Sequence, residues 1–180
     1  MRTKYIQYFS LLTIFIISFT IVISSVFPRE KYITVNYNQL TVDAKQQVEC
    51  LAQNIYYEAG HEPETGQVAV ALVTLNRVKD GRFADDICSV VKQKTRVAHI
   101  GDRYVVCQFS WFCETRKPIK QEVYDRVMRV ALYVYANYEM INDVTHGALY
   151  YHADYVNPRW KLTKTVTIGR HIFYKEKVGT

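Results

Sequence analysis

The sequence predicts a helix-rich α+β domain with a small C-terminal sheet, preceded by one N-terminal transmembrane helix. Three observations predict this fold class. Residues 5–28 form an uncharged apolar stretch, apolar residues recur at helical spacing between residues 44 and 138, and the last 35 residues contain short strand-like runs. No internal repeat or second linker interrupts residues 43–177, so we expect them to form one domain.

The first 28 residues have the composition of a membrane anchor. No charged residue lies between Lys4 and Arg29, where Ile, Phe, Leu and Val dominate. This stretch is longer than the core of a secretory signal peptide, about 7–15 residues, and reaches the roughly 20 residues that cross a bilayer as a helix. We therefore expect residues 1–28 to be a signal anchor and residues 29–42 to be a tether. Signal cleavage near Ser24-Ser25, followed by secretion, is the alternative.

Two helices are predicted after the tether. The first covers residues 44–58, with Asp43 as its N-cap and Gly60 placed to end it. The second opens at Pro63 and stops at residues 79–81. We expect it to bury one apolar stripe, made of Val68, Ala71, Leu72, Leu75 and Val78.

The second half of the domain alternates irregular and regular segments. A short helix is expected over residues 84–91 and the longest helix over residues 120–138. Residues 92–117 show no period and contain two cysteines and an aromatic cluster, which predicts a structured loop or small hairpin. Strands are expected at residues 148–152, 164–168 and 171–175.

The charge balance limits the classes of partner. The chain has a net charge of +6, and without Arg2 and Lys4 of the expected anchor 21 basic residues stand against 17 acidic ones, or +4. These residues are scattered, whereas a nucleic-acid platform has a concentrated basic face, so we expect no nucleic-acid partner. A mildly basic surface suits an anionic polymer. Tyrosine is the compositional outlier, at 15 of 180 residues.

Four cysteines follow the apolar segment: Cys50, Cys88, Cys107 and Cys113. An even number behind an export signal predicts up to two disulfides, with three possible connectivities. No cysteine pair or nearby histidine has the spacing of a zinc site. Disulfides require an oxidising compartment, so we expect the domain outside the cytoplasmic membrane, on the periplasmic or outer side.

Glu58 is the strongest candidate for chemistry. It stands at the end of an apolar helix, where burial and the negative end of the helix dipole both disfavour its ionised form. A carboxyl group whose pKa is raised in this way suits a general acid at neutral pH. The alternative is a glutamate at a helix end that points into water.

Several motifs in order resemble the SleB-type cell wall hydrolases, the family of spore cortex-lytic enzymes. The resemblance covers residues 50–92 and 107–173, nearly the whole expected domain. The matching elements are Tyr57-Glu58-Ala59 with Glu62-Pro63, Gly66 to Ala71, Leu75-Asn76-Arg77-Val78, Val90-Val91, Cys107-Gln108-Phe109-Ser110, Gly147 to Tyr151, and Ile168 to Phe173.

The resemblance implies a lysozyme-like fold related to lytic transglycosylases, with peptidoglycan as substrate and no cofactor. The family's catalytic glutamate falls on Glu58, which would cleave the bond between N-acetylmuramic acid and N-acetylglucosamine. It would act as a lytic transglycosylase or muramidase. A lytic transglycosylase needs no second carboxylate, because the C6 hydroxyl of the sugar can close a 1,6-anhydro ring and no water is required. This chain departs from the family motif at Gly60 and His61, which removes an arginine that could have paired with Glu62.

The other candidates have substrate-binding or bracing roles. Glu62 is assigned to bracing, since Gly60 and Pro63 break the helix before it. Gln108 and Ser110 suit the N-acetyl groups of a glycan, and Asn76 suits a buried amide. Tyr150 and Tyr151 alternate on a strand, so only one of them can face a cleft. Asp143 and Asp154 are weaker candidates, as turn residues.

Two other functions remain open from the sequence. A zinc-dependent N-acetylmuramoyl-L-alanine amidase would need three protein ligands and an open position. His146, His152 and His171 are the candidates, but they form no tight pair, so we expect no metal site. A wall-binding module without activity is the second alternative, because of the departure at Gly60 and His61.

Overall fold

The computed structural model describes residues 32–99, 102–115 and 117–177. The predicted anchor over residues 1–28 and the first residues of the tether lie outside these ranges. Residues from Ile33 onward belong to one compact unit. Among the described helices, none has the length and apolar character needed to cross a membrane.

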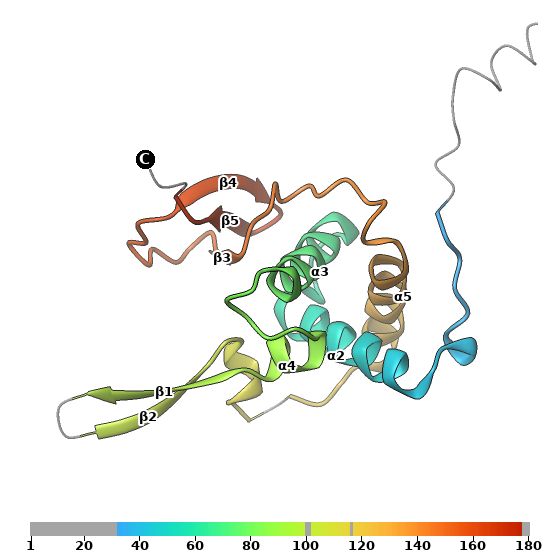
Figure 1. Ribbon diagram of the computed structural model, residues 1–180, viewed down its shortest axis with the longest axis horizontal. Helices are drawn as coiled ribbons and strands as arrows, with labels where there is room; N and C mark the ends of the chain where they lie inside the picture. The colour runs from blue at the N-terminus through green and yellow to red at the C-terminus, as the bar shows by residue number, and fades with distance from the viewer. Residues whose placement is uncertain (1–31, 100–101, 116, 178–180) are drawn as a thin grey trace, which may run out of the picture. The chain divides into compact units, whose positions relative to one another are not determined.

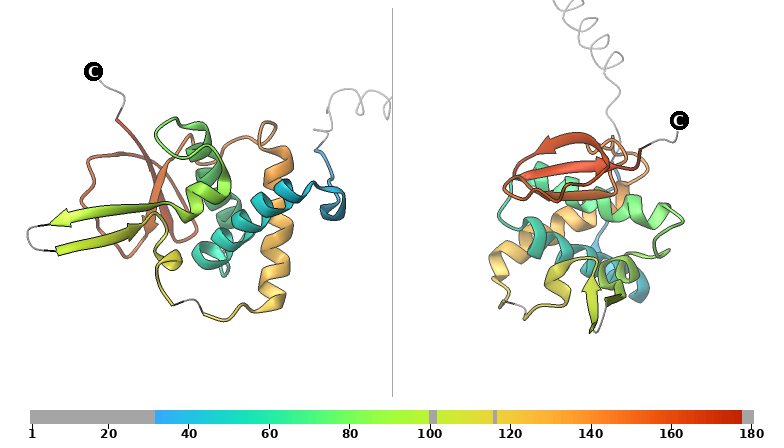
Figure 2. Two further views of the ribbon diagram at one scale, coloured as in Figure 1. Left: turned by 60° about the horizontal axis from the view of Figure 1, so that its bottom comes forward. Right: turned by 90° about the vertical axis from the view of Figure 1, so that its left-hand side faces the viewer.

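The described residues contain four α-helices and two short 3-10 helices (Figures 1 and 2). In chain order they are η1 (Tyr37–Gln39), α2 (Val42–Ala59), α3 (Glu64–Lys79), α4 (Ile87–Lys92), η2 (Ser110–Phe112) and α5 (Gln121–Asn137). The predicted helices are therefore all present, with ends that differ by one to three residues.

Two helix starts differ from the prediction because other residues provide the caps. Thr41, not Asp43, is the N-cap of α2: its extended backbone lets its hydroxyl accept a hydrogen bond from the Ala44 amide at 3.2 Å. Asp43 lies in the first turn instead, where a negative charge is favourable. In the same way, Asp86 accepts a hydrogen bond from the Ser89 amide at 2.9 Å and starts α4 three residues later than expected.

Helix α3 is buried on nearly all sides, so the prediction of a single apolar stripe was wrong. Ala71, Leu72 and Leu75 pack in the core between the helices. Ala69 and Val73 form a second small core with Ala148 and Phe173 of the C-terminal region. Val68 and Val78 of the predicted stripe are only partly buried. The spacing of apolar residues did not indicate this central position, because α3 also buries the polar residues Gln67, Thr74 and Arg77.

Residues 92–117, for which a structured loop or a small hairpin was predicted, contain a β-hairpin. Strands β1 (Lys94–His99) and β2 (Asp102–Cys107) pair antiparallel, with Lys94 opposite Cys107. The hairpin extends away from the helices (Figure 1). It leads directly into η2, whose residue Trp111 is buried in the helical core.

The last part of the chain forms the predicted small sheet. Strands β3 (Tyr150–Ala153), β4 (Thr163–Ile168) and β5 (His171–Lys175) are antiparallel, in the order β3-β5-β4. Tyr151 stands opposite Phe173, whose ring is buried against α3, so this is the inner face of the sheet. Because side chains alternate along a strand, Tyr150 and His152 belong to the outer face.

All four cysteines are paired, as Cys50–Cys88 and Cys107–Cys113. The prediction of two disulfides is confirmed, and one of the three connectivities is selected. The first bond joins α2 to α4 across a sequence separation of 38 residues, and closing a loop of that length stabilises a fold by about 3–4 kcal/mol. The second bond closes a separation of only 6 residues, at the base of the hairpin.

Candidate active site

Glu58 stands on the last turn of α2, and the helix ends just after it, with Gly60 as its C-cap. Gly60 is the C-cap and keeps a right-handed conformation, with φ −59° and ψ −22°. A Cβ atom at this position would lie 2.4 Å from the carbonyl oxygen of Tyr56. The helix therefore ends at Gly60 as predicted, with a right-handed and not a left-handed backbone, and a residue with a side chain would not fit at this position.

The carboxyl group of Glu58 faces the inner side of the sheet. The hydroxyl of Tyr151 donates a hydrogen bond to its Oε2 at 3.1 Å. Burial raises the pKa of Glu58, and the nearby charge of Glu114 acts in the same direction. The hydrogen bond from Tyr151 and the positive charge of Arg77 oppose this shift without cancelling it. The raised pKa expected from the sequence is thus present, with burial as its main cause.

Arg77 is a residue whose role the sequence analysis missed. Its side chain is 4% exposed, and its Nε donates a hydrogen bond to the carbonyl oxygen of Leu149 at 2.7 Å. When the Gln108 amide is oriented to satisfy its neighbours, its oxygen accepts from both terminal nitrogens of Arg77, at 3.2 and 3.3 Å. The guanidinium also lies over three rings, those of Phe109 at 4.9 Å, Phe83 at 5.4 Å and Tyr150 at 6.0 Å.

Burial lowers the pKa of Arg77, and Tyr151, Tyr150 and Glu58 counteract the shift. Because a guanidinium keeps its proton in proteins, a fixed positive charge stands close behind the candidate acid. The signal for this role was present in the sequence: Arg77 is the one charged residue between Thr65 and Val78 of an otherwise buried helix.

The segment after the hairpin is fastened to the same turn of α2 that carries Glu58. The main-chain nitrogen of Lys120 donates to the Tyr56 hydroxyl at 2.8 Å, and the Tyr57 hydroxyl donates to the Lys117 carbonyl at 3.3 Å. The Trp111 ring stacks on Tyr57 with centroids 4.6 Å apart. Tyr56 and Tyr57 therefore fix the segment from η2 to the start of α5 against the end of α2.

The candidate residues of this segment divide between binding and bracing. Gln108 is engaged with Arg77, and Phe109 is 3% exposed in the core. Ser110 is exposed at the start of η2. Of the three, Ser110 is the residue whose hydroxyl is accessible to a ligand.

Glu62 has the geometry of a bracing residue. Its Oε2 accepts a hydrogen bond from the main-chain nitrogen of Arg170 at 3.3 Å, in the turn between β4 and β5. A Cβ atom at Gly169, which has φ +56°, would lie 2.1 Å from this oxygen. A backbone amide of the sheet thus provides a partner for Glu62 in a chain whose motif lacks the family's arginine.

Asn76 also acts as a brace. Its Nδ2 donates to Asp143 at 3.0 Å, to the Ala148 carbonyl at 3.1 Å and to Thr145 at 3.4 Å, while its Oδ1 accepts from the Tyr138 hydroxyl at 2.7 Å. Burial alone would raise the pKa of Asp143, but hydrogen bonds from Thr145 and Asn76 outweigh it and lower the pKa. These contacts fix the turn that leads into β3.

The two adjacent tyrosines of β3 have different surroundings. Tyr151 lies on the inner face, beside His171 at 5.1 Å and Phe173 at 5.6 Å between ring centroids, and contacts Glu58. The Tyr150 hydroxyl donates to Glu176 at 2.7 Å, away from Glu58. As the alternation predicted, one of the two faces the candidate site, and it is Tyr151.

The histidines considered as zinc ligands do not meet. His152 points to the outer face of the sheet, where its Nε2 lies 2.9 Å from the Tyr174 hydroxyl. His171 points to the inner face, where it is 7% exposed and burial lowers its pKa. His146 is an exposed turn residue with φ +58°. In the described part of the chain, no three His, Cys, Asp or Glu side chains are grouped so that they could hold a metal ion.

Asp154, one of the weaker candidates, is paired with Arg170 at 3.2 Å on the surface.

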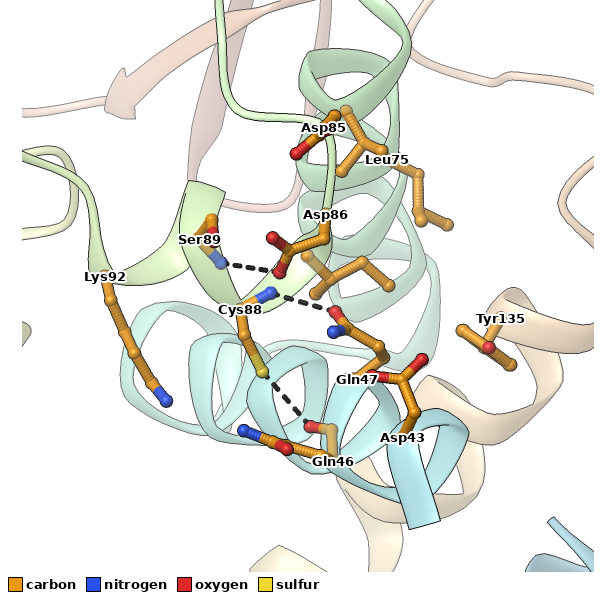
Figure 3. Close-up of a pocket in the computed structure, with 12 residues that line it drawn as sticks. Asp43, Gln46, Gln47, Leu75, Asp85, Asp86, Cys88, Ser89, Lys92 and Tyr135 are labelled. Atoms are coloured by element: carbon orange, nitrogen blue, oxygen red, sulfur yellow. Dashed lines mark hydrogen bonds between the residues drawn. The ribbon is translucent and has the colours of Figure 1, made fainter. Parts of the chain in front are cut away.

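A separate pocket of about 880 Å³ lies between α2, α3 and α4 (Figure 3). Its polar groups are used in local structure: Asp86 caps α4, and Gln47 accepts a hydrogen bond from the Cys88 amide at 3.0 Å. Neither Glu58 nor any other candidate site residue lines it. We therefore place the candidate active site at Glu58, where an acid with a raised pKa, a tyrosine hydroxyl and a buried cation come together.

Comparison with known proteins agrees with this fold and shows the family. Residues 61–174 match the Cell Wall Hydrolase family, and the chain belongs to that family. The resemblance found in the sequence motifs is confirmed. The family match begins at His61, so Glu58 lies just before it, and its assignment depends on the geometry of the site.

The chain is similar to spore cortex-lytic enzymes of known organisms. It is 27% identical over 135 residues to that of Bacillus cereus and 28% identical over 135 residues to that of Oceanobacillus iheyensis, covering 73% of this chain in both cases. It spans 45% and 42% of the length of these two relatives. The chain therefore covers less than half of each.

Solved structures support the helix-rich α+β fold. The catalytic domain of the Bacillus cereus SleB protein aligns with a TM-score of 0.51 at 24% identity, covering 76% of this chain and 94% of that one. The catalytic domain of the germination-specific lytic transglycosylase SleB from Bacillus anthracis aligns with a TM-score of 0.50 at 25% identity, covering 77% and 98%.

The brace between Glu62 and the β4–β5 turn can be tested at Gly169. Gly169→Ala places a Cβ atom against Glu62 and puts alanine in a left-handed backbone, so we expect the free energy of unfolding to fall by at least about 1–2 kcal/mol. Denaturant unfolding of the full chain in mild detergent measures this. Gly81→Ala is the control, since a Cβ there meets nothing within 4 Å, and should change stability by less than about 0.5 kcal/mol. Equal effects of the two substitutions would contradict the brace.

Proposed function

We propose that this protein cleaves the glycan strands of peptidoglycan between N-acetylmuramic acid and N-acetylglucosamine, as a lytic transglycosylase with Glu58 as its acid and base. The observation that carries the proposal is the half-buried Glu58 carboxyl group, with its raised pKa and its hydrogen bond from Tyr151. Membership of the Cell Wall Hydrolase family supports the substrate. The likeness to a Bacillus anthracis domain described as a lytic transglycosylase supports the reaction type.

In the first step, protonated Glu58 gives its proton to the glycosidic oxygen. The bond between this oxygen and C1 of N-acetylmuramic acid breaks, and positive charge develops at C1. Glu58 becomes a carboxylate, which is stabilised by the Tyr151 hydroxyl and by the charge of Arg77. These two groups act on the form of Glu58 that appears as the bond breaks, so they favour the transition state over the bound substrate.

In the second step, the Glu58 carboxylate takes a proton from the C6 hydroxyl of the same sugar. The C6 oxygen then bonds to C1 and closes a 1,6-anhydro ring. The proton that left Glu58 is thereby replaced, and no water is consumed. One carboxyl group is sufficient for this sequence, whereas hydrolysis by a glycosidase usually needs two.

A Glu58→Gln substitution tests the acid. Because glutamine cannot donate a proton, we expect cleavage of purified sacculi to fall by about 10³-fold or more. Glu64→Gln is the matched control, an exposed carboxylate at the start of α3, and should cleave at the native rate.

The products of the same digestion separate the alternative functions. Anhydro-ended muropeptides support transglycosylation, and reducing ends would indicate hydrolysis by water. Free peptides that disappear with a chelator would indicate an amidase. No release of any product by the native chain would indicate a binding module, and native cleavage by Glu58→Gln would remove Glu58 from the mechanism.

The electrostatic role of Arg77 has its own test. Its positive charge lowers the pKa of Glu58, so Arg77→Met should raise that pKa. Glu58 then stays protonated to higher pH, and the alkaline limb of the pH dependence of kcat/KM moves upward. The rate should fall about ten-fold or more, because the carboxylate formed in the first step loses its stabilisation.

Arg77→Lys keeps the charge but loses the two contacts to Gln108, so its pH profile should remain near the native one. An activity loss in Arg77→Met without any movement of the alkaline limb would mean that Arg77 only supports the fold.

We also propose that residues 1–28 anchor the chain in the bacterial cytoplasmic membrane, with the domain on the outer side. The uncharged stretch between Lys4 and Arg29 and the two disulfides support this location. In cells that express the full chain, we expect the intact protein in the membrane fraction, degraded by protease added to spheroplasts. A shorter chain in the medium would instead support signal cleavage and secretion. Protection from the protease in intact spheroplasts would contradict the orientation.

A further inference from the structure

An aromatic cluster lies on the outer face of the C-terminal sheet, opposite the face that contacts Glu58. The rings of His152 and Tyr174, from neighbouring strands, are stacked with centroids 5.1 Å apart. The Trp160 ring, from the connection between β3 and β4, stands nearly perpendicular to both, at 5.4 Å from His152 and 5.7 Å from Tyr174. Tyr150 completes the cluster at 6.2 Å from Trp160. These four residues, Tyr150, His152, Trp160 and Tyr174, are called the outer aromatic cluster below.

Trp160 is held in place yet remains accessible. It contacts three rings, and 42% of its surface is still exposed. The residue before it, Arg159, has φ +52°, a left-handed backbone that is uncommon for a residue with a side chain. Such strain persists where the surrounding structure imposes it and is frequent at functional sites. In the described residues, the indole nitrogen of Trp160 has no hydrogen-bond acceptor, so its N–H is free for a ligand or water.

The outer aromatic cluster connects to the candidate active site through Arg77. The Arg77 guanidinium lies over Phe109 on one side and over Tyr150 on another, and Arg77 also acts on Glu58 by its charge. Tyr150 and Tyr151 are consecutive residues of one short strand, with one in the cluster and the other bonded to Glu58. The outer aromatic cluster and the candidate active site therefore share β3, which is an edge strand of the sheet.

The charges beside Trp160 favour a particular polymer. Arg159 and Lys161 flank it, and both are exposed. Peptidoglycan strands carry carboxylates on the stem peptides, which are attached through the lactyl group of every second sugar, while the faces of their pyranose rings present C–H groups. An exposed indole with an apolar face and a free N–H, with a cationic residue before and after it in the sequence, complements both features.

We infer that the outer aromatic cluster is a second glycan-binding site, at which a pyranose ring of the peptidoglycan strand stacks on Trp160 while carboxylates pair with Arg159 and Lys161. This inference rests on the proposed function for the identity of the polymer. The site holds the strand at a distance from the cleaved bond, so it should matter for long strands and not for short fragments.

The emission of Trp160 reports binding directly, because the chain contains only two tryptophans and the other, Trp111, is 7% exposed. The experiment uses the full chain in mild detergent with Glu58→Gln to suppress turnover. Addition of soluble peptidoglycan strands of six or more sugars should change the tryptophan emission in a saturable way. Trp160→Phe should abolish the change, and Trp160→Ala should weaken binding about ten-fold. Disaccharide fragments should produce little change.

Tyr155→Ala is the matched control, since Tyr155 lies in the same connection, is 78% exposed and belongs to no part of the cluster. It should bind long strands like the native chain. An unchanged emission of Trp160 at saturating strand concentration, or equal weakening by Trp160→Ala and Tyr155→Ala, would overturn the inference.

Binding and cleavage can fail separately. With active protein, Trp160→Ala should raise KM for long strands about ten-fold and leave cleavage of short fragments unchanged. If Glu58→Gln still cleaves but Trp160 responds to strands, the proposed mechanism fails and the second site stands. Binding of uncharged chitin oligosaccharides as tightly as peptidoglycan strands would contradict the role of the two cations.

Discussion

The rest of the site depends on the contacts that satisfy the buried Arg77 guanidinium. A cation that is 4% exposed must have its donors satisfied, because an uncompensated buried charge is strongly destabilising. Its partners come from separate parts of the chain: the Leu149 carbonyl before β3, the Gln108 amide after β2, and rings from three segments. Satisfying Arg77 thus requires the sheet, the hairpin segment and α3 to meet at one place, beside Glu58.

Around Glu58, opposing effects act on the pKa of the carboxyl group, and the net shift is upward. Burial and Glu114 favour its protonated form, while Tyr151 and Arg77 favour its charged form. The reaction proposed for Glu58 requires its carboxyl group to lose and regain a proton in one turnover, and groups that favour each of the two forms suit that proposed role. Bracing contacts fix the surroundings of Glu58. Glu62 joins the loop between α2 and α3 to the β4–β5 turn, and Asn76 joins α3 to the segment before β3. Tyr56 and Tyr57 join α2 to the segment before α5.

Prediction from the sequence succeeded where local signals decide the outcome. Helical spacing located α2, α3 and α5, and the breaks at Gly60 and at residues 79–81 located the ends of α2 and α3. Prediction failed for α3, whose central position appears only when helices and sheet cover it from several sides. The role of Arg77 was missed for the same reason, since its partners lie 31 and 72 residues further along the chain, at Gln108 and Leu149.

By itself, the sequence determined the family, the acid candidate and the presence of disulfides, because these depend on motifs, on position in a helix and on a count of cysteines. Only the tertiary structure decided which cysteines pair, which of Tyr150 and Tyr151 contacts Glu58, and that Gln108 serves Arg77. It also brought Trp160 against His152 and Tyr174. The physical reason is that hydrogen bonds, ring contacts and desolvation act over a few ångströms in space, and spacing along the chain does not report those distances for residues on different elements.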